Sequence, residues 1–356
     1  LEIDSQETEP EPLTPGPNDW VVTGTEVHEN EIIILTGNLI IRSGGILTLK
    51  NCRLLINCSY NGEWEIGVER GGMLNVLEGS EITTYNPRYW FIFHVYGSLT
   101  MRDSSLSKCR YYLGMWGACP GLRLETDEGV IIENCVINGT CYCCWASGII
   151  IRNDTLNGIW CHRASSITIT DCVIIYDGCG IKCDGSSHHI TIRNCVINMR
   201  NTAYCGIYCY EVSDIIIMVC TINQGYGPCV YCCRSTGIVI KDNIFARNGI
   251  FLCGDKLCHY ASHIIEDNLV NGRPLYYIVN ITGPYEIMKA GQVIIVNSKH
   301  VRLTCSNLSS VFTGLDIICS KDICIENSLI KEDTYGIYCH EASNITITDC
   351  VISRCH

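Results

Sequence analysis

A short motif recurs along this chain, and its period constrains the fold more than any other feature. Gly-Ile-x-Cys begins at residues 158, 180, 206 and 336, and the first three copies lie 22 and 26 residues apart. Each copy is followed by a polar turn and a short segment that ends in Cys. These segments are Ile167–Cys172, Ile190–Cys195, Ile215–Cys220 and Ile345–Cys350. Their alternation of apolar and polar residues predicts half-buried strands rather than helices.

Looser copies of the unit fill the N-terminal third. Segments 45–52, 72–79 and 97–104 each begin with Gly and lie 27 and 25 residues apart. A unit of this length, with short strands and Gly, Asn or Ser turns, is one coil of a parallel β-helix. Leucine-rich repeats need a Leu ladder that the sequence lacks, and a propeller blade needs roughly 40 residues. We therefore expect an all-β solenoid of roughly a dozen coils.

Charge and hydropathy narrow the function classes. The chain has 356 residues and a net charge of −12 at pH 7. Nucleic-acid phosphates need a basic face, so we expect no nucleic-acid partner. Apolar runs such as Ile32–Leu35 are too short for a membrane span, and none is expected.

The 27 cysteines indicate an oxidising compartment. We expect an extracellular or cell-surface protein whose signal peptide has been removed, because the chain starts at Leu1 without a signal pattern. Thermophiles also contain proteins this rich in cysteine, which favours such a source. The odd count leaves at least one thiol free, metal-bound or paired with another chain.

Cysteines at equivalent positions of successive units should stack about 4.8 Å apart inside the solenoid. The two expected inward columns contain Cys161, Cys183, Cys209, Cys232 and Cys339, and Cys52, Cys135, Cys172, Cys195, Cys220 and Cys350. They are either small core residues or bridges between coils, and both interpretations stay open. The disulfide candidates, without assigned pairing, are Cys141, Cys143, Cys144, Cys179, Cys183, Cys205, Cys209, Cys229 and Cys233.

The pattern Gly-Ile-x-Cys…Ser-x-x-Ile-x-Ile-x-Asn/Asp resembles the right-handed parallel β-helix repeat proteins of the pectate-lyase-like superfamily. Segments 271–277 and 290–297 resemble archaeal surface and periplasmic proteins related to a copper-binding β-helix protein. The resemblance covers about residues 30–356 and implies a right-handed single-stranded parallel β-helix (solenoid). It also implies an insertion before the coils resume at Val301. It does not specify function, because this scaffold carries many activities.

The predicted organisation has two parts. Residues 1–20 form an extended acidic, Pro-rich arm, for which polyproline II is the expected conformation. Residues 21–356 form the β-helix. Its expected segments are looser coils 21–128, Cys-rich regular coils 129–270, an insertion 271–298 and terminal coils 299–356.

The sequence contains no recognisable catalytic motif. Polygalacturonase-like enzymes carry an Asp-Asp pair and a Gly-His-Gly, and this sequence has neither, so we expect no enzyme. Asp171 and Asp349 alternate with Asn134 and Asn194 at turn positions, which predicts stacked turn hydrogen bonds. A scattered group could instead bind a cation or a sugar: Asp177, Asp184, Glu211 and Asp214, with Arg163 and Lys182.

Metal binding has little support in the sequence. Cys-His dipeptides recur, but adjacent strand residues point to opposite faces and cannot share one ion. We expect no cofactor and assign no metal site. If a metal binds, Cys253, Cys258 and His259 are the weak candidates, since Cys253 and Cys258 share one loop.

Six Asn-x-Ser/Thr sequons are candidates for N-glycosylation in a secreted protein. They are Asn57, Asn138, Asn153, Asn280, Asn307 and Asn344.

The leading functional hypothesis is a structural subunit of an extracellular filament or cell-surface assembly. The sequence stops inside a coil, and an open solenoid end is a template for head-to-tail stacking of the chain with itself. Arm exchange and disulfides would add to assembly, with Cys355 as the intersubunit candidate.

The alternative is a secreted carbohydrate-binding or polysaccharide-cleaving β-helix protein, whose partners are glycans. Aromatic residues expected in loops could form a sugar platform. They are Tyr111, Tyr112, Trp116, Trp145, Tyr226 and Tyr231.

Overall fold

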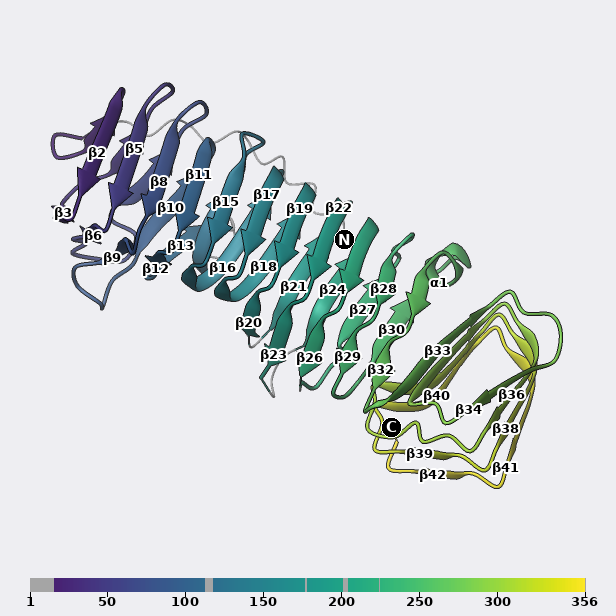
Figure 1. Ribbon diagram of the computed structural model, residues 1–356. Coiled ribbons are helices and arrows are strands. Elements are labelled where there is room, and N and C mark those ends of the chain that lie inside the picture. Colours follow the sequence, from purple (N-terminus) through teal and green to yellow (C-terminus); the bar gives the residue numbers. More distant parts are fainter. Residues whose placement is uncertain (1–15, 113–117, 177, 201–203, 224, 356) are drawn as a thin grey trace.

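The computed structural model describes residues 16–112, 118–176, 178–200, 204–223 and 225–355. These residues form two stacks of β-coils, which we call the first stack (20–270) and the second stack (273–353) (Figure 1). The predicted all-β solenoid is confirmed, and its sheets contain 11 and four coils rather than a dozen in one stack. The described residues contain a single helix, α1 (Cys258–Ala261), so no described helix could cross a membrane.

The first stack has three faces of stacked strands, which pair in parallel except where β13 pairs antiparallel with β14 on the third face. The first face consists of β2 (Thr25–Glu29), β5 (Ile46–Lys50), β8 (Met73–Leu77), β11 (Ser98–Arg102), β15 (Val130–Glu133), β17 (Ser147–Arg152), β19 (Ser165–Thr170), β22 (His188–Arg193), β25 (Ser213–Met218), β28 (Val239–Lys241) and β31 (Ile264–Glu266). The second face consists of β3 (Ile32–Leu35), β6 (Arg53–Ile56), β9 (Glu81–Thr84), β12 (Ser105–Leu106), β20 (Val173–Tyr176), β23 (Val196–Met199), β26 (Thr221–Asn223), β29 (Ile244–Phe245) and β32 (Leu269–Val270).

The third face carries the candidate site. It consists of β1 (Trp20–Val22), β4 (Leu39–Ile41), β7 (Glu65–Val68), β10 (Phe91–Val95), β13 (Cys109–Tyr112), β14 (Ala118–Leu124), β21 (Cys179–Asp184), β24 (Cys205–Tyr210), β27 (Val230–Cys233) and β30 (Ile250–Cys253). The long strands β16 (Val136–Cys144) and β18 (Thr155–His162) continue from the second face into the third.

Side-chain alternation explains why these segments coil. Ile167, Ile190 and Ile215 pair in register on neighbouring coils and are buried in one continuous core. The chain turns between faces at residues with positive φ, such as Asp171 (58°) and Asn194 (52°), residue types that tolerate this conformation. Asn194 Nδ2 donates to Asp171 Oδ1 at 2.5 Å, which confirms the predicted stacked turn hydrogen bonds.

The chain reverses direction at the end of the first stack. β32 pairs antiparallel with β33 (Arg273–Val279), with Val270 opposite Arg273. The segment predicted as an insertion contains β33, β34 (Tyr285–Met288) and β35 (Gln292–Val296). The remaining strands of the second stack are β36 (Lys299–Thr304), β37 (Thr313–Ile318), β38 (Lys321–Glu326), β39 (Leu329–Lys331), β40 (Tyr335–His340), β41 (Ser343–Thr348) and β42 (Val351–Ser353).

The side of the second stack covers the end of the first stack. All five residues of β35 are buried, because Val293 and Ile295 face the second core while Ile294 and Val296 face the first. Figure 1 shows the second stack turned relative to the first, so that its coils are seen nearly end-on. The core of the first stack therefore ends against a sheet and not against solvent.

Candidate functional site

A row of large side chains runs along the outer surface of the third face. We call it the aromatic row: Tyr142, Trp160, Lys182, Tyr208, Tyr231 and Phe251, which pair in register from β16 to β30. Each member lies between two buried residues, as Trp160 does between Ile159 and Cys161. Strand alternation thus forces the row outward.

The rings of the row contact one another. Tyr208 and Tyr231 stack with centroids 5.2 Å apart and planes 6° apart. Tyr142 lies 4.9 Å from Trp160, and Tyr231 lies 5.7 Å from Phe251. Stacked rings cover each other's faces, so the half-buried members of the row present ring edges to solvent. Tyr142 is only 3% exposed and stacks on Tyr111 instead. Tyr204, which is 62% exposed, lies beside the row at 6.4 Å from both Tyr208 and Tyr231.

A charged cluster occupies the middle of the row. The Asp184 carboxylate lies 2.7 Å from Lys182 Nζ and 2.6 Å from His162 Nδ1, and it accepts a hydrogen bond from Trp160 Nε1 at 3.0 Å. Lys182 Nζ lies 3.9 Å from the Trp160 ring centroid. Burial opposes ionisation, but His162 and Lys182 outweigh it and hold the pKa of Asp184 below its ordinary value.

A basic cavity precedes the row along the first stack, where the turn before β10 meets β13, β14 and β16. It has a volume of about 230 Å³, and its described lining contains three basic side chains and no acidic one: Arg88, Lys108 and Arg110. Trp90 also lines it, with the Arg110 guanidinium 5.3 Å from the indole centroid. A cavity of this kind suits a flat anionic group.

A larger groove of about 770 Å³ lies on the second stack. Its described lining consists mainly of turn residues such as Asn307, Asn327 and Asp349, and it includes no aromatic side chain. Apolar and polar groups do not converge there as they do on the third face, so we place the candidate site at the aromatic row.

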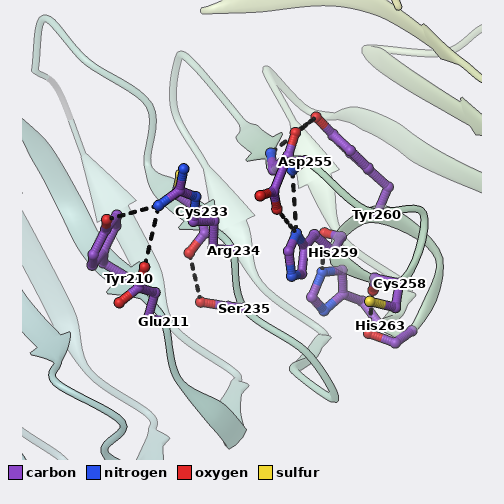
Figure 2. Close-up of polar contacts among 12 residues, drawn as sticks. Tyr210, Glu211, Cys233, Arg234, Ser235, Asp255, Cys258, His259, Tyr260 and His263 are labelled. Carbon is purple, nitrogen blue, oxygen red and sulfur yellow. Dashed lines mark hydrogen bonds and ion pairs between the residues drawn. The ribbon is translucent and has the colours of Figure 1, made fainter. Parts of the chain in front are cut away.

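The weak metal candidates do not come together. Cys253 contacts the Tyr231 hydroxyl at 3.2 Å, whereas His259 pairs with Asp255 at 3.1 Å and Cys258 is exposed on α1. Figure 2 shows His259 turned toward Asp255 and away from Cys233 and Arg234. Among the residues in Figure 2 and the rest of the described chain, no group of three His, Cys, Asp or Glu could hold a metal ion.

The disulfide candidates occupy two environments. Cys143, Cys161, Cys183, Cys209 and Cys232 form one in-register column in the core. Cys179 and Cys205 pair at the start of their strands. The Cys229 thiol contacts the carbonyl of Arg247 at 2.8 Å. The remaining candidates are buried or half-buried: Cys141, Cys144 and Cys233.

The other predicted sites are distributed over both stacks. Four sequon asparagines are exposed and two are half-buried; the exposed ones are Asn138, Asn153, Asn280 and Asn344, and the half-buried ones are Asn57 and Asn307. Cys355 packs against the second core, with its thiol near the Ile330 carbonyl. Residues 1–15 of the arm, Trp116 and the Tyr112 side chain lie outside the described residues.

Sequence reasoning found part of this site. Tyr231, Asp184 and Lys182 were among the sugar-binding candidates, and all three lie in or beside the row. Trp160, Tyr208 and Phe251 were missed. A signal was available, because Trp160, Lys182 and Tyr208 occupy the variable position of Gly-Ile-x-Cys, the one position of that motif that faces outward.

Comparisons with solved structures find other β-helices. A mutant of the periplasmic alginate epimerase AlgG is 9% identical, with a TM-score of 0.49 over 89% of this chain and 78% of that chain. The A-module of a mannuronan C-5 epimerase from Azotobacter vinelandii is 13% identical, with a TM-score of 0.39 over 87% and 91%. PfbA, a surface adhesin of Streptococcus pneumoniae, is 10% identical, with a TM-score of 0.40 over 92% and 85%. Similarities this low transfer no activity.

Sequence comparison gives a single family. No curated protein sequence matches this chain. Residues 121–287, which include β16 to β30 and therefore the aromatic row, match the model of a family described as "Right handed beta helix region". The match covers slightly less than half of the chain and agrees with the parallel β-solenoid described above.

Proposed function

We propose that this protein binds an extended carbohydrate chain along the aromatic row. The observation that carries the proposal is the row itself: ring, hydroxyl and charged groups stand in register on six consecutive strand segments, and the five members from Trp160 to Phe251 are partly exposed. A repeat of about 4.8 Å per coil suits a ligand that is itself a linear repeat.

The row offers the contacts that sugars use. Ring edges give apolar contact to sugar C–H groups, while the tyrosine hydroxyls and Lys182 offer hydrogen bonds. Tyr204 projects beside the stacked pair Tyr208 and Tyr231, so its ring extends the apolar surface without being needed for the coil.

The basic cavity favours an acidic carbohydrate. Arg88 and Lys108 line it without an acidic neighbour in its described lining, in a chain whose net charge is −12. Local basic groups against an acidic background favour a carboxylate at that point. We therefore expect a uronate polymer to bind more tightly than a neutral one.

Isothermal titration of the full chain tests this proposal. We expect hexagalacturonate to bind, cellohexaose to bind at least several-fold more weakly, and Tyr204→Ala to weaken hexagalacturonate binding about 3- to 10-fold, as the loss of one aromatic contact implies. Tyr285→Ala is the matched control, because Tyr285 lies on β34 of the second stack. Equal affinity of the Tyr204 and Tyr285 variants would contradict binding at the row.

A cleaving activity is the second candidate, and the Asp184–His162 pair favours it. With Nδ1 held by Asp184, His162 has Nε2 as its proton-accepting atom. It would take the proton from the sugar carbon beside the carboxylate. The C–H electron pair would form a C=C bond while the glycosidic oxygen leaves and takes a proton from water. Ultraviolet absorbance of the unsaturated product, lost in His162→Gln with binding retained, would support this candidate.

Three sequence predictions remain predictions. Filament assembly by head-to-tail stacking depends on contacts between chains. The prediction of an extracellular location rests on the cysteine content. The resemblance to copper-binding relatives has no matching group of metal ligands in the described residues.

A further inference from the structure

Two pairs of thiols lie at the margins of the third face. Cys179 and Cys205 pair in register on β21 and β24, with their sulfur atoms 3.1 Å apart. Cys233 and Cys253 pair in register on β27 and β30. Cys179, Cys233 and Cys253 are all partly exposed, unlike the fully buried cysteine column of the core.

The backbone geometry permits a bond in both pairs. In-register residues on adjacent parallel strands are about 4.8 Å apart, within the Cα separation of 4.4–6.8 Å that disulfides span. Both Cys233 and Cys253 follow outward members of the aromatic row by two residues, so their side chains point to the same face. Cys232 cannot replace Cys233, because it points into the core.

Pairing in the core column is ambiguous, whereas among the described residues Cys233 and Cys253 are each other's one in-register thiol. Cys161, Cys183 and Cys209 each have an in-register thiol on both sides. Cys253 has an in-register thiol neighbour only in Cys233, since β30 is the last strand of the face. Partial exposure to solvent and a single in-register thiol partner thus coincide at Cys233 and Cys253.

We propose that a low-molecular-weight disulfide oxidant of the glutathione class converts two pairs of thiols into disulfides, Cys179–Cys205 and Cys233–Cys253. The cysteines of the core column stay reduced under the same conditions. The Cys233 thiolate attacks the oxidant and releases one small thiolate, leaving a mixed disulfide. Cys253 then loses its proton to solvent and attacks Cys233 Sγ, which releases the second small thiolate. Cys179, the more exposed member, begins the same exchange with Cys205.

The electrostatics at both pairs agree with this order of attack. Contact with the Cys253 thiol lowers the pKa of Cys233 to about 7. Contact with Cys205 lowers the pKa of Cys179 below its ordinary value. The partner that becomes the thiolate is therefore the nucleophile in each pair.

Disulfide mapping of the full chain tests the proposal. The native protein, equilibrated with oxidised glutathione, is alkylated without unfolding and then digested for mass spectrometry. We expect two linked peptide pairs, 179 with 205 and 233 with 253, each lighter by two hydrogens. In Cys233→Ser the second link disappears while the first remains, which also shows that the variant is folded.

Cys324→Ser is the matched control. Cys324 is half-buried on β38, and its register neighbours are Arg302 and Thr346, so it has no in-register thiol. The variant should retain both links. Free thiols at all four positions after oxidation, or links from Cys233 or Cys179 to cysteines of the core column, would overturn the proposal. Carbohydrate binding plays no part in this readout.

Discussion

At the scale of single residues, the solenoid core holds acidic side chains where most coils place Cys, Ser or Asn. Asp154 is 1% exposed; its Oδ1 accepts a hydrogen bond from the Cys135 backbone N–H at 2.6 Å, and its Oδ2 has no partner among the described residues. Burial raises the pKa of Asp154 to about 7. The folded protein therefore keeps this carboxyl in its neutral form at pH values below about 7.

This raised pKa predicts a pH dependence of stability. Between pH 3.8 and about 7 the unfolded chain ionises Asp154 while the folded chain keeps the proton. The free energy of unfolding should fall as pH rises through this window, by about 1–4 kcal/mol from this group. Urea unfolding at pH 4 and pH 8 should show a smaller fall for Asp154→Asn than for the wild type.

Asp103→Asn is the control for that experiment, because Asp103 is an exposed turn residue. A slope remains in every variant, since burial also raises the pKa of Asp333 to about 7. An identical pH dependence in wild type and Asp154→Asn would refute the assignment of a neutral carboxyl.

At the scale of elements, buried side-chain amides join neighbouring coils. Asn243 accepts a hydrogen bond from the Cys220 backbone N–H at 2.8 Å and donates to the Ile217 carbonyl and the Asn268 side chain. These bonds satisfy backbone groups that the turn would otherwise bury without partners.

Removing this amide should therefore destabilise the stack. Asn243→Ala should lower the free energy of unfolding by about 2–3 kcal/mol, because the buried Cys220 N–H loses its acceptor. Asn198→Ala should cost less, since Asn198 is half-buried and accepts a single side-chain bond from Asn223. Equal losses for the two variants, measured by chemical unfolding, would show that burial does not decide the effect.

The strands of these elements were predictable because each coil repeats the same local physics. Each coil has Ile at alternate positions, Asn or Asp at the corner and Gly before the strand, and each of these specifies a local conformation. The regular spacing of the repeated unit then predicts that the coils stack on one another. The row residues were harder to predict. Trp160 and Phe251 each sit in an ordinary strand pattern, and their alignment becomes visible with the strand register.

At the scale of the whole molecule, the junction between the stacks determines the shape. Gln292 is fully buried there; its Oε1 accepts from Ile250 N–H at 2.9 Å, and its Nε2 donates to the carbonyls of Ile250 and Thr313. Asp316 is also buried at this boundary, and burial raises its pKa well above its ordinary value. The sequence could not indicate this junction, because β35 reads as an apolar strand whatever covers its outer side.

Gln292→Ala should loosen this junction. The backbone groups of Ile250 and Thr313 lose their partner, so we expect a loss of about 2–4 kcal/mol and faster hydrogen exchange in β30 and β35. Tyr285→Ala is the control and should leave exchange in both strands unchanged, because Tyr285 is exposed on β34, which pairs with β36. Unchanged exchange in Gln292→Ala would mean that apolar packing alone holds the stacks together.

The central claim is that the third face of the solenoid binds a carbohydrate chain. A crystal structure of the full chain with hexagalacturonate tests this claim most directly. We predict the sugar to cross the strands of the third face along Trp160, Tyr208 and Tyr231, with a carboxylate in the cavity of Arg88 and Lys108 or against Lys182. Sugar bound instead in the groove of Asn307 and Asp349, with the third face empty, would contradict the claim.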